Sequence, residues 1–209
     1  ADDTVLMGKS AQVVERALHH IQHTALQYNL KLNLGKCVVL KQNGHNTVHF
    51  INGTAVPHKN QAKYLGVILR QDCSSHTDIV SRIAKARAGF NKLQKFWKHT
   101  DINTQWKLKV YRATFIPMLT YGMESTALTQ PLTNRLEAFH AQCLRKVLNI
   151  KATYYTEVLN PSYETTNNHD VLTAAKSTTI LATIQKQQLK LLGHIYRAPN
   201  SDLTKDVSF

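Results

Sequence analysis

Two adjacent carboxylates, Asp2 and Asp3, are the first residues whose types and spacing could do chemistry. Mg²⁺ prefers hard oxygen ligands, and it takes the rest of its coordination shell from water and substrate phosphates. Neighbouring side chains of a regular strand point to opposite faces, so both carboxylates can face one ion only if the backbone turns there. We therefore expect a turn just before a short buried strand over "TVLMG". Taken alone, the pair is more typical of a solvated turn.

The charge of the chain indicates a polyanionic partner. Its 209 residues include 26 Lys and Arg against 13 Asp and Glu, a formal net charge of +13, which favours binding to RNA or DNA. Residues 58–112 carry twelve Lys and Arg against three Asp, a net charge of +9.

No stretch approaches the roughly 20 apolar residues that span a bilayer, so we expect no membrane partner. Three cysteines without CxxC spacing indicate neither a disulfide framework nor a zinc finger.

The hydrophobic pattern predicts a mixed part followed by a helical part, with a boundary near residues 70–76. A first helix should begin after Ser10 and end at a left-handed Asn29. Hairpin-type turns at Asn43-Gly44 and Asn52-Gly53 predict antiparallel sheet over "CVVL", "TVHFI" and "TAV", and "AKYLGVIL" predicts a further strand. Helices are predicted over residues 76–98, 103–122, 131–149 and 174–197, with a polar loop at "NPSYETTNNHD" before the last.

Within residues 79–98, apolar residues recur at helical spacing and the cations occupy the remaining surface. The apolar stripe is Ile79, Ile83, Ala86, Phe90, Leu93 and Trp97. The cations are Lys85, Arg87, Lys92, Lys95 and Lys98. One face would pack on a small bundle and the other would face nucleic-acid phosphates, although a solvated basic face has the same pattern. Trp97 and Trp106 are expected to pack and not to stack on bases, and Cys143 is expected in the core.

The segments "ADDTVLMGKS", "YNLKLNLGKC" and "KYLGVIL" together resemble, in this order, the second half of the reverse-transcriptase palm of non-LTR (LINE-type) retrotransposons. In that family an aromatic residue, Ala and Asp-Asp form a hairpin, so we expect the chain to start inside it. "YGMESTALT", "FHAQCLRKVLNI" and "LLGHIYR" resemble the helices that follow the thumb. The implied fold is α+β: a partial palm over residues 1–74, thumb-like basic helices over 75–125 and a post-thumb helical bundle over 126–209.

The resemblance implies an RNA-directed DNA polymerase, a Mg²⁺-dependent nucleotidyltransferase whose partners are an RNA template, a DNA primer and deoxynucleoside triphosphates. Asp2 and Asp3 would be catalytic and would bind the two Mg²⁺ ions. Lys36 would be a further catalytic residue, protonating or neutralising the leaving pyrophosphate. The primer grip would comprise Tyr64, Leu65 and Gly66, with Gly66 permitting close approach of a primer phosphate. The five cations of residues 79–98 would contact the template–primer.

A further catalytic carboxylate lies upstream in the family, so we expect the isolated chain to be inactive without the missing N-terminal part of the same polyprotein. The implied location is intracellular, in the nucleus and cytoplasm, as a ribonucleoprotein.

Two alternatives remain open. One is a non-catalytic RNA- or DNA-binding module derived from such an element. The other is a group II intron-type reverse transcriptase, against which the Cys-Leu-Arg and Leu-Gly-His segments argue.

Overall fold

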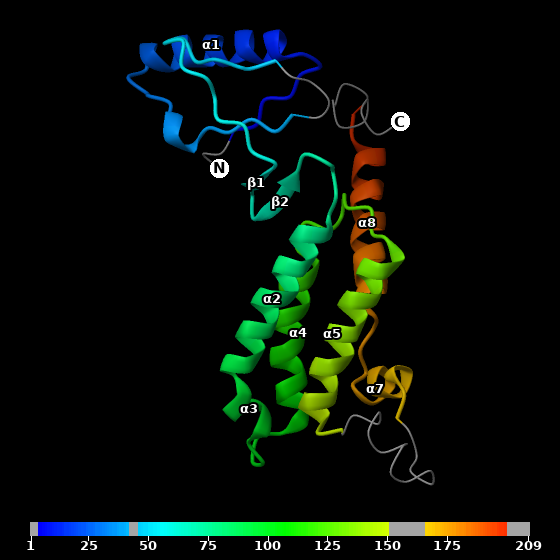
Figure 1. Cartoon of the computed structure of the whole chain (residues 1–209). Helices are drawn as coiled ribbons and strands as arrows, with labels where there is room; N and C mark the ends of the chain where they lie inside the picture. Colours follow the sequence, from blue (N-terminus) through cyan, green and yellow to red (C-terminus); the bar gives the residue numbers. More distant parts are fainter. Residues whose placement is uncertain (1–3, 42–45, 151–165, 200–209) are drawn as a thin grey trace. The chain divides into compact units, whose positions relative to one another are not determined.

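The computed structural model describes residues 4–41, 46–150 and 166–199 (Figure 1). Over these residues the chain is α+β, with seven α-helices, one short 3-10 helix and a two-stranded antiparallel sheet. The elements are α1 (Ala11–Gln27), η1 (Leu34–Lys36), β1 (Gln61–Tyr64), β2 (Val67–Arg70), α2 (His76–Lys92), α3 (Gln94–Lys98), α4 (Thr104–Thr120), α5 (Gln130–Leu148), α7 (Asn168–Ala174) and α8 (Ile180–Arg197). Among these described helices, none combines the length and apolar character that crossing a bilayer requires.

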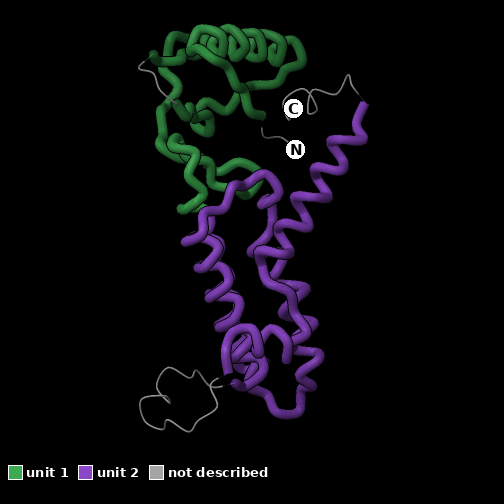
Figure 2. Tube along the Cα trace, turned by 90° about the vertical axis from the view of Figure 1, so that its right-hand side faces the viewer, with its two compact units in different colours: residues 1–78 green, residues 79–209 purple. Residues whose placement is uncertain are grey.

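The chain divides into two compact units, residues 1–78 and 79–209 (Figure 2). The first unit holds α1, the loops that follow it, the hairpin β1–β2 and the first three residues of α2, whereas the second holds the rest of α2 and the helices that follow it. The finer division into palm, thumb and post-thumb parts at residues 74 and 125 stays a prediction.

In the first unit, α1 forms as predicted. Ser10 Oγ accepts a hydrogen bond from the N–H of Val13 at 3.3 Å, so the expected N-cap is present. Asn29 has a φ of 57°, the left-handed conformation expected at the helix end. The small core beneath α1 is Val48, Phe50 and Val56, on which Ala11, Val14 and Leu18 pack.

The strands predicted over residues 37–56 are absent as regular elements. Pairing in the described part is limited to two isolated bridges, His49 with Ala55 and Val39 with His58. The turn at Asn52-Gly53 does form, with Gly53 at a φ of 79°, whereas Asn43-Gly44 lies outside the described residues. The backbone N–H of His49 donates to Glu15 Oε2 of α1 at 2.7 Å. This N–H is therefore already satisfied by a helix side chain and is not available to pair with a further strand.

The strand predicted over "TVLMG" is also absent. Residues 4–8 have no regular structure, and Met7 is 90% exposed. A strand is stable only when a neighbour satisfies its backbone groups, and no described segment pairs with these residues.

The segment "AKYLGVIL" forms a hairpin instead of the single strand that was predicted. β1 and β2 pair antiparallel, with Tyr64 opposite Val67. Leu65 and Gly66 form the two-residue turn with φ values of 45° and 87°. Positive φ at both central positions matches the twist of the flanking strands, and Gly66 adopts it without a Cβ clash.

In the second unit, α5 packs against α4, α7 and α8. Each of these four helices contributes buried side chains to the core. The helix predicted over residues 76–98 is divided into α2 and α3 at Leu93. The carbonyl of Phe90 accepts from the N–H of Leu93 and from the indole N–H of Trp97 at 2.8 Å. Because these donors take the place of the regular i+4 N–H, the helix breaks and Trp97 stacks on Phe90 with ring centroids 4.7 Å apart.

The helix predicted over residues 174–197 is also two helices. α7 begins inside the predicted polar loop, because Asn167 and Asp170 form a reciprocal capping box. Lys176 then has a φ of 47°, which ends the first helix. Thr179 Oγ1 accepts from the N–H of Ala182 at 3.0 Å and starts α8. Most of the segment "NPSYETTNNHD" lies outside the described residues.

Candidate nucleic-acid interface

The predicted metal ligands, Asp2 and Asp3, lie outside the described residues. Lys36 is exposed at the end of η1, where its N–H donates to the carbonyl of Asn33 at 3.1 Å. The thiol of Cys37 donates to the same carbonyl at 3.3 Å. This turn holds the backbone of Lys36 and leaves its side chain exposed. The catalytic roles of the three residues stay predictions.

The predicted primer grip is the turn of the β1–β2 hairpin. Tyr64 is half-buried at the end of β1, whereas Leu65 and Gly66 are exposed at the tip. A turn without a side chain at Gly66 presents its backbone to a ligand more closely than a strand interior would. The structure brings these three residues together at one exposed turn, but it does not test their role.

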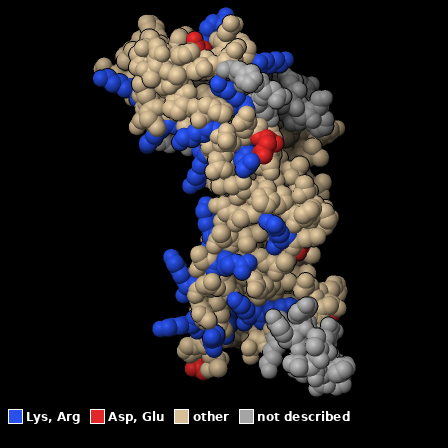
Figure 3. All heavy atoms as spheres, viewed as in Figure 1, with Lys and Arg blue, Asp and Glu red and all other residues tan. Residues whose placement is uncertain are grey.

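The five predicted cations of α2 and α3 are exposed, although Arg87 lies towards α5, where its Cζ atom is 5.4 Å from the centroid of the Phe139 ring. Lys85, Arg87, Lys92, Lys95 and Lys98 are all exposed, and we call them the α2–α3 basic surface. Lys and Arg side chains protrude over these two helices in the space-filling view (Figure 3). The described carboxylate closest in sequence on the C-terminal side is Asp101, which follows α3. The predicted segregation of cations from the apolar stripe is therefore present.

Four of the six residues of the apolar stripe are buried, Ile83 is partly buried and Leu93 is exposed. Ile79, Ala86, Phe90 and Trp97 are at most 5% exposed, and Ile83 packs against the same core. Leu93 is exposed, because it lies at the break between α2 and α3. Trp97 packs as predicted.

Trp106 does not pack as predicted. It is 62% exposed at the start of α4, and Lys109 Nζ lies 5.0 Å from the centroid of its indole ring. An exposed tryptophan beside a lysine is a combination that stacks on bases and contacts phosphates. The helical spacing did not predict the exposure of Trp106, because this residue precedes the first buried turn of α4.

Some of the cations that make residues 58–112 strongly positive serve the fold. Lys107 is buried, and its Nζ donates to the carbonyls of Trp97 and His99 at 2.9 and 2.7 Å, closing the end of α3. Arg112 donates to the carbonyls of Ala175 and Lys176 between α7 and α8. Arg82 is buried and donates to the carbonyl of Tyr121. The charge available to a polyanion is therefore smaller than the count from sequence.

Burial in the core shifts the pKa values of two titratable groups, Cys143 and His140. Burial raises the pKa of the Cys143 thiol to about 12, so this residue stays protonated near neutral pH and is a core residue as predicted. Burial lowers the pKa of His140 to about 4. Across the described residues, no group of three or more His, Cys, Asp and Glu is placed to hold a metal ion.

Two proteins of transposable elements are similar to this chain. The RNA-directed DNA polymerase from mobile element jockey of Drosophila funebris is 26% identical over 162 residues, which is 70% of this chain and 17% of that protein. An uncharacterized transposon-derived protein of Caenorhabditis elegans is 24% identical over 208 residues, which is 94% of this chain and 70% of that protein. No protein-family model matches the chain, and no solved structure matches it significantly.

This distant similarity supports a chain derived from a reverse-transcriptase-like element of the non-LTR type. The chain spans less than a fifth of the length of the jockey polymerase. The similarity therefore concerns a part of such a protein and does not identify which region it is.

Proposed function

We propose that the chain is a segment of the reverse transcriptase of a non-LTR retrotransposon, comprising the end of the palm, a thumb of basic helices and the helices that follow it. Two facts support this assignment. The similarity to the jockey polymerase extends over 70% of the chain, and the family-like segments occur in the expected order. The intact parent protein would synthesise DNA on an RNA template, in a ribonucleoprotein found in the nucleus and cytoplasm.

The α2–α3 basic surface binds the phosphate backbone of the template–primer in this proposal. The observation that carries it is that all five cations are exposed while the stripe on the other side of the helices is buried. A rigid helix pair can thus present several positive charges at once without losing its packing. Such contacts position a nucleic acid and do not read its sequence.

The catalytic part of the proposal concerns residues of the first unit. Asp2 and Asp3 supply carboxylates, which are the donors that Mg²⁺ prefers, and bound Mg²⁺ would activate the primer hydroxyl and stabilise the leaving group. Lys36 neutralises charge on the pyrophosphate, and the turn at Tyr64–Gly66 supports the primer end.

Salt-dependent binding tests the role of the α2–α3 basic surface. Each phosphate neutralised on duplex DNA contributes about −0.9 to the slope of log K against log salt concentration. A Lys85→Gln, Lys92→Gln, Lys95→Gln variant should bind duplexes of unrelated sequence more weakly, with a slope flatter by roughly two to three. Binding can be followed by fluorescence anisotropy with a labelled RNA–DNA hybrid.

The matched control removes the same charge from elsewhere in the second unit. Lys176, Lys186 and Lys190 are exposed and lie outside α2 and α3, so changing all three to Gln should leave the slope closer to that of the wild type. Equal slopes for the two triple variants would mean that the α2–α3 surface is an ordinary solvated face.

A further inference from the structure

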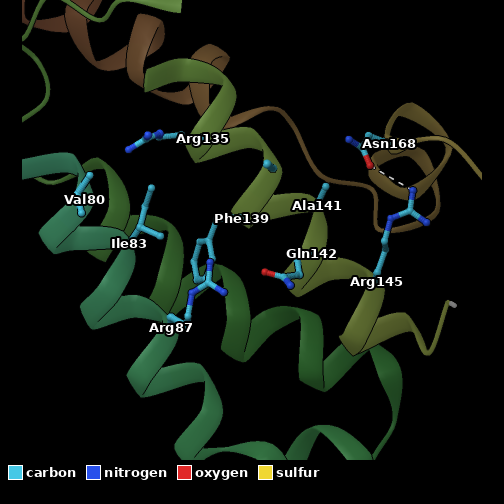
Figure 4. Close-up of a pocket in the computed structure, with 10 residues that line it drawn as sticks. Val80, Ile83, Arg87, Arg135, Phe139, Ala141, Gln142, Arg145 and Asn168 are labelled. Carbon is cyan, nitrogen blue, oxygen red and sulfur yellow. Dashed lines mark hydrogen bonds between the residues drawn. The ribbon is translucent and has the colours of Figure 1, made fainter. Parts of the chain in front are cut away.

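A pocket lies between α2 and α5 in the second unit and extends to α7 (Figure 4). Its volume is about 590 Å³, within the range of about 300–1,000 Å³ that is usual for small-ligand sites. Three arginines contribute to its lining, Arg87, Arg135 and Arg145, and none of its lining residues is acidic. Val80 and Ile83 of α2 supply apolar surface. The pocket is therefore both positively charged and partly apolar.

The arginines reach the pocket from two helices. Arg87 belongs to α2, whereas Arg135 and Arg145 belong to α5 (Figure 4). Ten residues of α-helix rise by about 15 Å, so the two α5 arginines start from opposite ends of the pocket. Gln142 lies between them on the same helix and also contributes to the lining.

Two of the three guanidinium groups are held in place by the protein. The Cζ atom of Arg87 lies 5.4 Å from the centroid of the Phe139 ring. Arg145 Nη2 donates to the carbonyl of Thr166 at 2.7 Å and to Asn168 Oδ1 at 3.1 Å. Its Nη1 is buried and has no hydrogen-bond partner among the described residues. Groups that are already positioned lose less conformational entropy when a ligand binds.

We propose that this pocket binds an unpaired nucleotide of a single-stranded nucleic acid. Guanidinium groups match phosphate oxygens in charge and geometry, and their planes stack on unpaired bases. The apolar side chains offer a surface for the sugar and the base. A concave site admits a nucleotide that has left the helical stack, whereas the phosphates of a duplex lie on its rigid outer surface. The choice of a nucleic acid over other phosphorylated ligands rests on the proposed function.

Arg87 belongs both to the α2–α3 basic surface and to the pocket, so the pocket is tested by two substitutions at residues outside the α2–α3 basic surface. Arg135→Gln removes an exposed cation, and Gln142→Glu places a negative charge in the pocket at nearly unchanged size. Each should weaken binding of a labelled single-stranded oligouridylate by about tenfold. Binding of a blunt RNA–DNA hybrid should remain close to that of the wild type. Lys190→Gln and Gln185→Glu, at exposed positions of α8, make the same charge changes outside the pocket.

The triple variant at Lys85, Lys92 and Lys95 separates this proposal from the preceding one. The triple variant should lose affinity for the hybrid, whereas the pocket variants should lose affinity for the single strand. The pocket proposal is overturned if both pocket variants bind the single strand like their controls, or if they weaken hybrid and single strand equally. If the triple variant binds the hybrid like the wild type while the pocket variants still weaken single-strand binding, only the assignment of the α2–α3 basic surface to duplex binding is contradicted. Circular dichroism of each variant checks that the helices are intact.

Discussion

The phenol of Tyr111 donates a hydrogen bond to Nδ1 of His140 at 2.8 Å and so joins α4 to α5 inside the core. Nε2 of the same imidazole lies 3.2 Å from the carbonyl of Thr178, in the connection between α7 and α8. Since a carbonyl only accepts, the partners assign the proton to Nε2 and leave Nδ1 as the acceptor. Both side chains are fully buried. One neutral tautomer therefore connects three parts of the second unit.

Removing the phenol hydroxyl should destabilise this unit. Tyr111→Phe leaves Nδ1 of a buried imidazole without a donor, which costs about 1–3 kcal/mol in the free energy of unfolding. Urea denaturation followed by circular dichroism measures the change. Tyr121→Phe is the control, because Tyr121 is 59% exposed and its hydroxyl can bond to water. Equal stability of the two variants would show that the Tyr111 bond adds no net stability.

Acid should destabilise the chain through His140. Burial lowers the pKa of this residue from 6.5 to about 4, so between these values the unfolded state binds more protons than the folded state. Stability therefore rises with pH in that range, is fully present above about 6.5, and is lost as the pH falls towards 4. The stability lost over this range is on the order of 3 kcal/mol.

A non-titrating replacement isolates this contribution. His140→Gln should be less stable than the wild type at pH 7, and its unfolding free energy should fall less steeply between pH 6.5 and 4. The quantity to compare is the slope of unfolding free energy against pH, measured by urea titration. Parallel slopes would show that other groups cause the acid sensitivity.

Lys107 should affect stability and not nucleic-acid binding. Lys107→Met keeps the length of the side chain but leaves the carbonyls of Trp97 and His99 without their donor, at a cost of about 1–3 kcal/mol. Because Nζ points into the protein, the salt slope of duplex binding should not change. Lys109→Met is the control for stability, since Lys109 is exposed. A flatter salt slope for Lys107→Met would contradict this structural role.

The proposed metal ligands can be tested in a protein extended by the remainder of a polymerase palm. Asp2→Asn together with Asp3→Asn should abolish Mg²⁺-dependent primer extension, because amides carry no charge to hold the ions. Thermal stability should remain nearly unchanged, and affinity for the RNA–DNA hybrid should be retained. Primer extension on a gel provides the readout. Full activity of the double variant would rule out the assignment.

The sequence alone predicted the features that depend on neighbours along the chain. The cap at Ser10 and the left-handed end at Asn29 need only a few adjacent residues, and both are present. The stripe from Ile79 to Trp97 follows the helical period, so its burial and the exposure of the cations between its members could be read from spacing. The relation to a reverse-transcriptase-like element was likewise predicted from short segments and is supported by the similar proteins.

Only the tertiary structure decided which polar groups bond across the fold. Lys107 and Lys109 are two residues apart and chemically alike, yet one closes α3 and the other is exposed. His49 donates to α1 and not to another strand, which replaced a predicted sheet with loops. The arginine-lined pocket likewise takes its lining from α2, α5 and α7, which are distant in sequence. Such partners are distant in sequence, and their choice depends on which buried donors and acceptors the whole packing leaves to be satisfied.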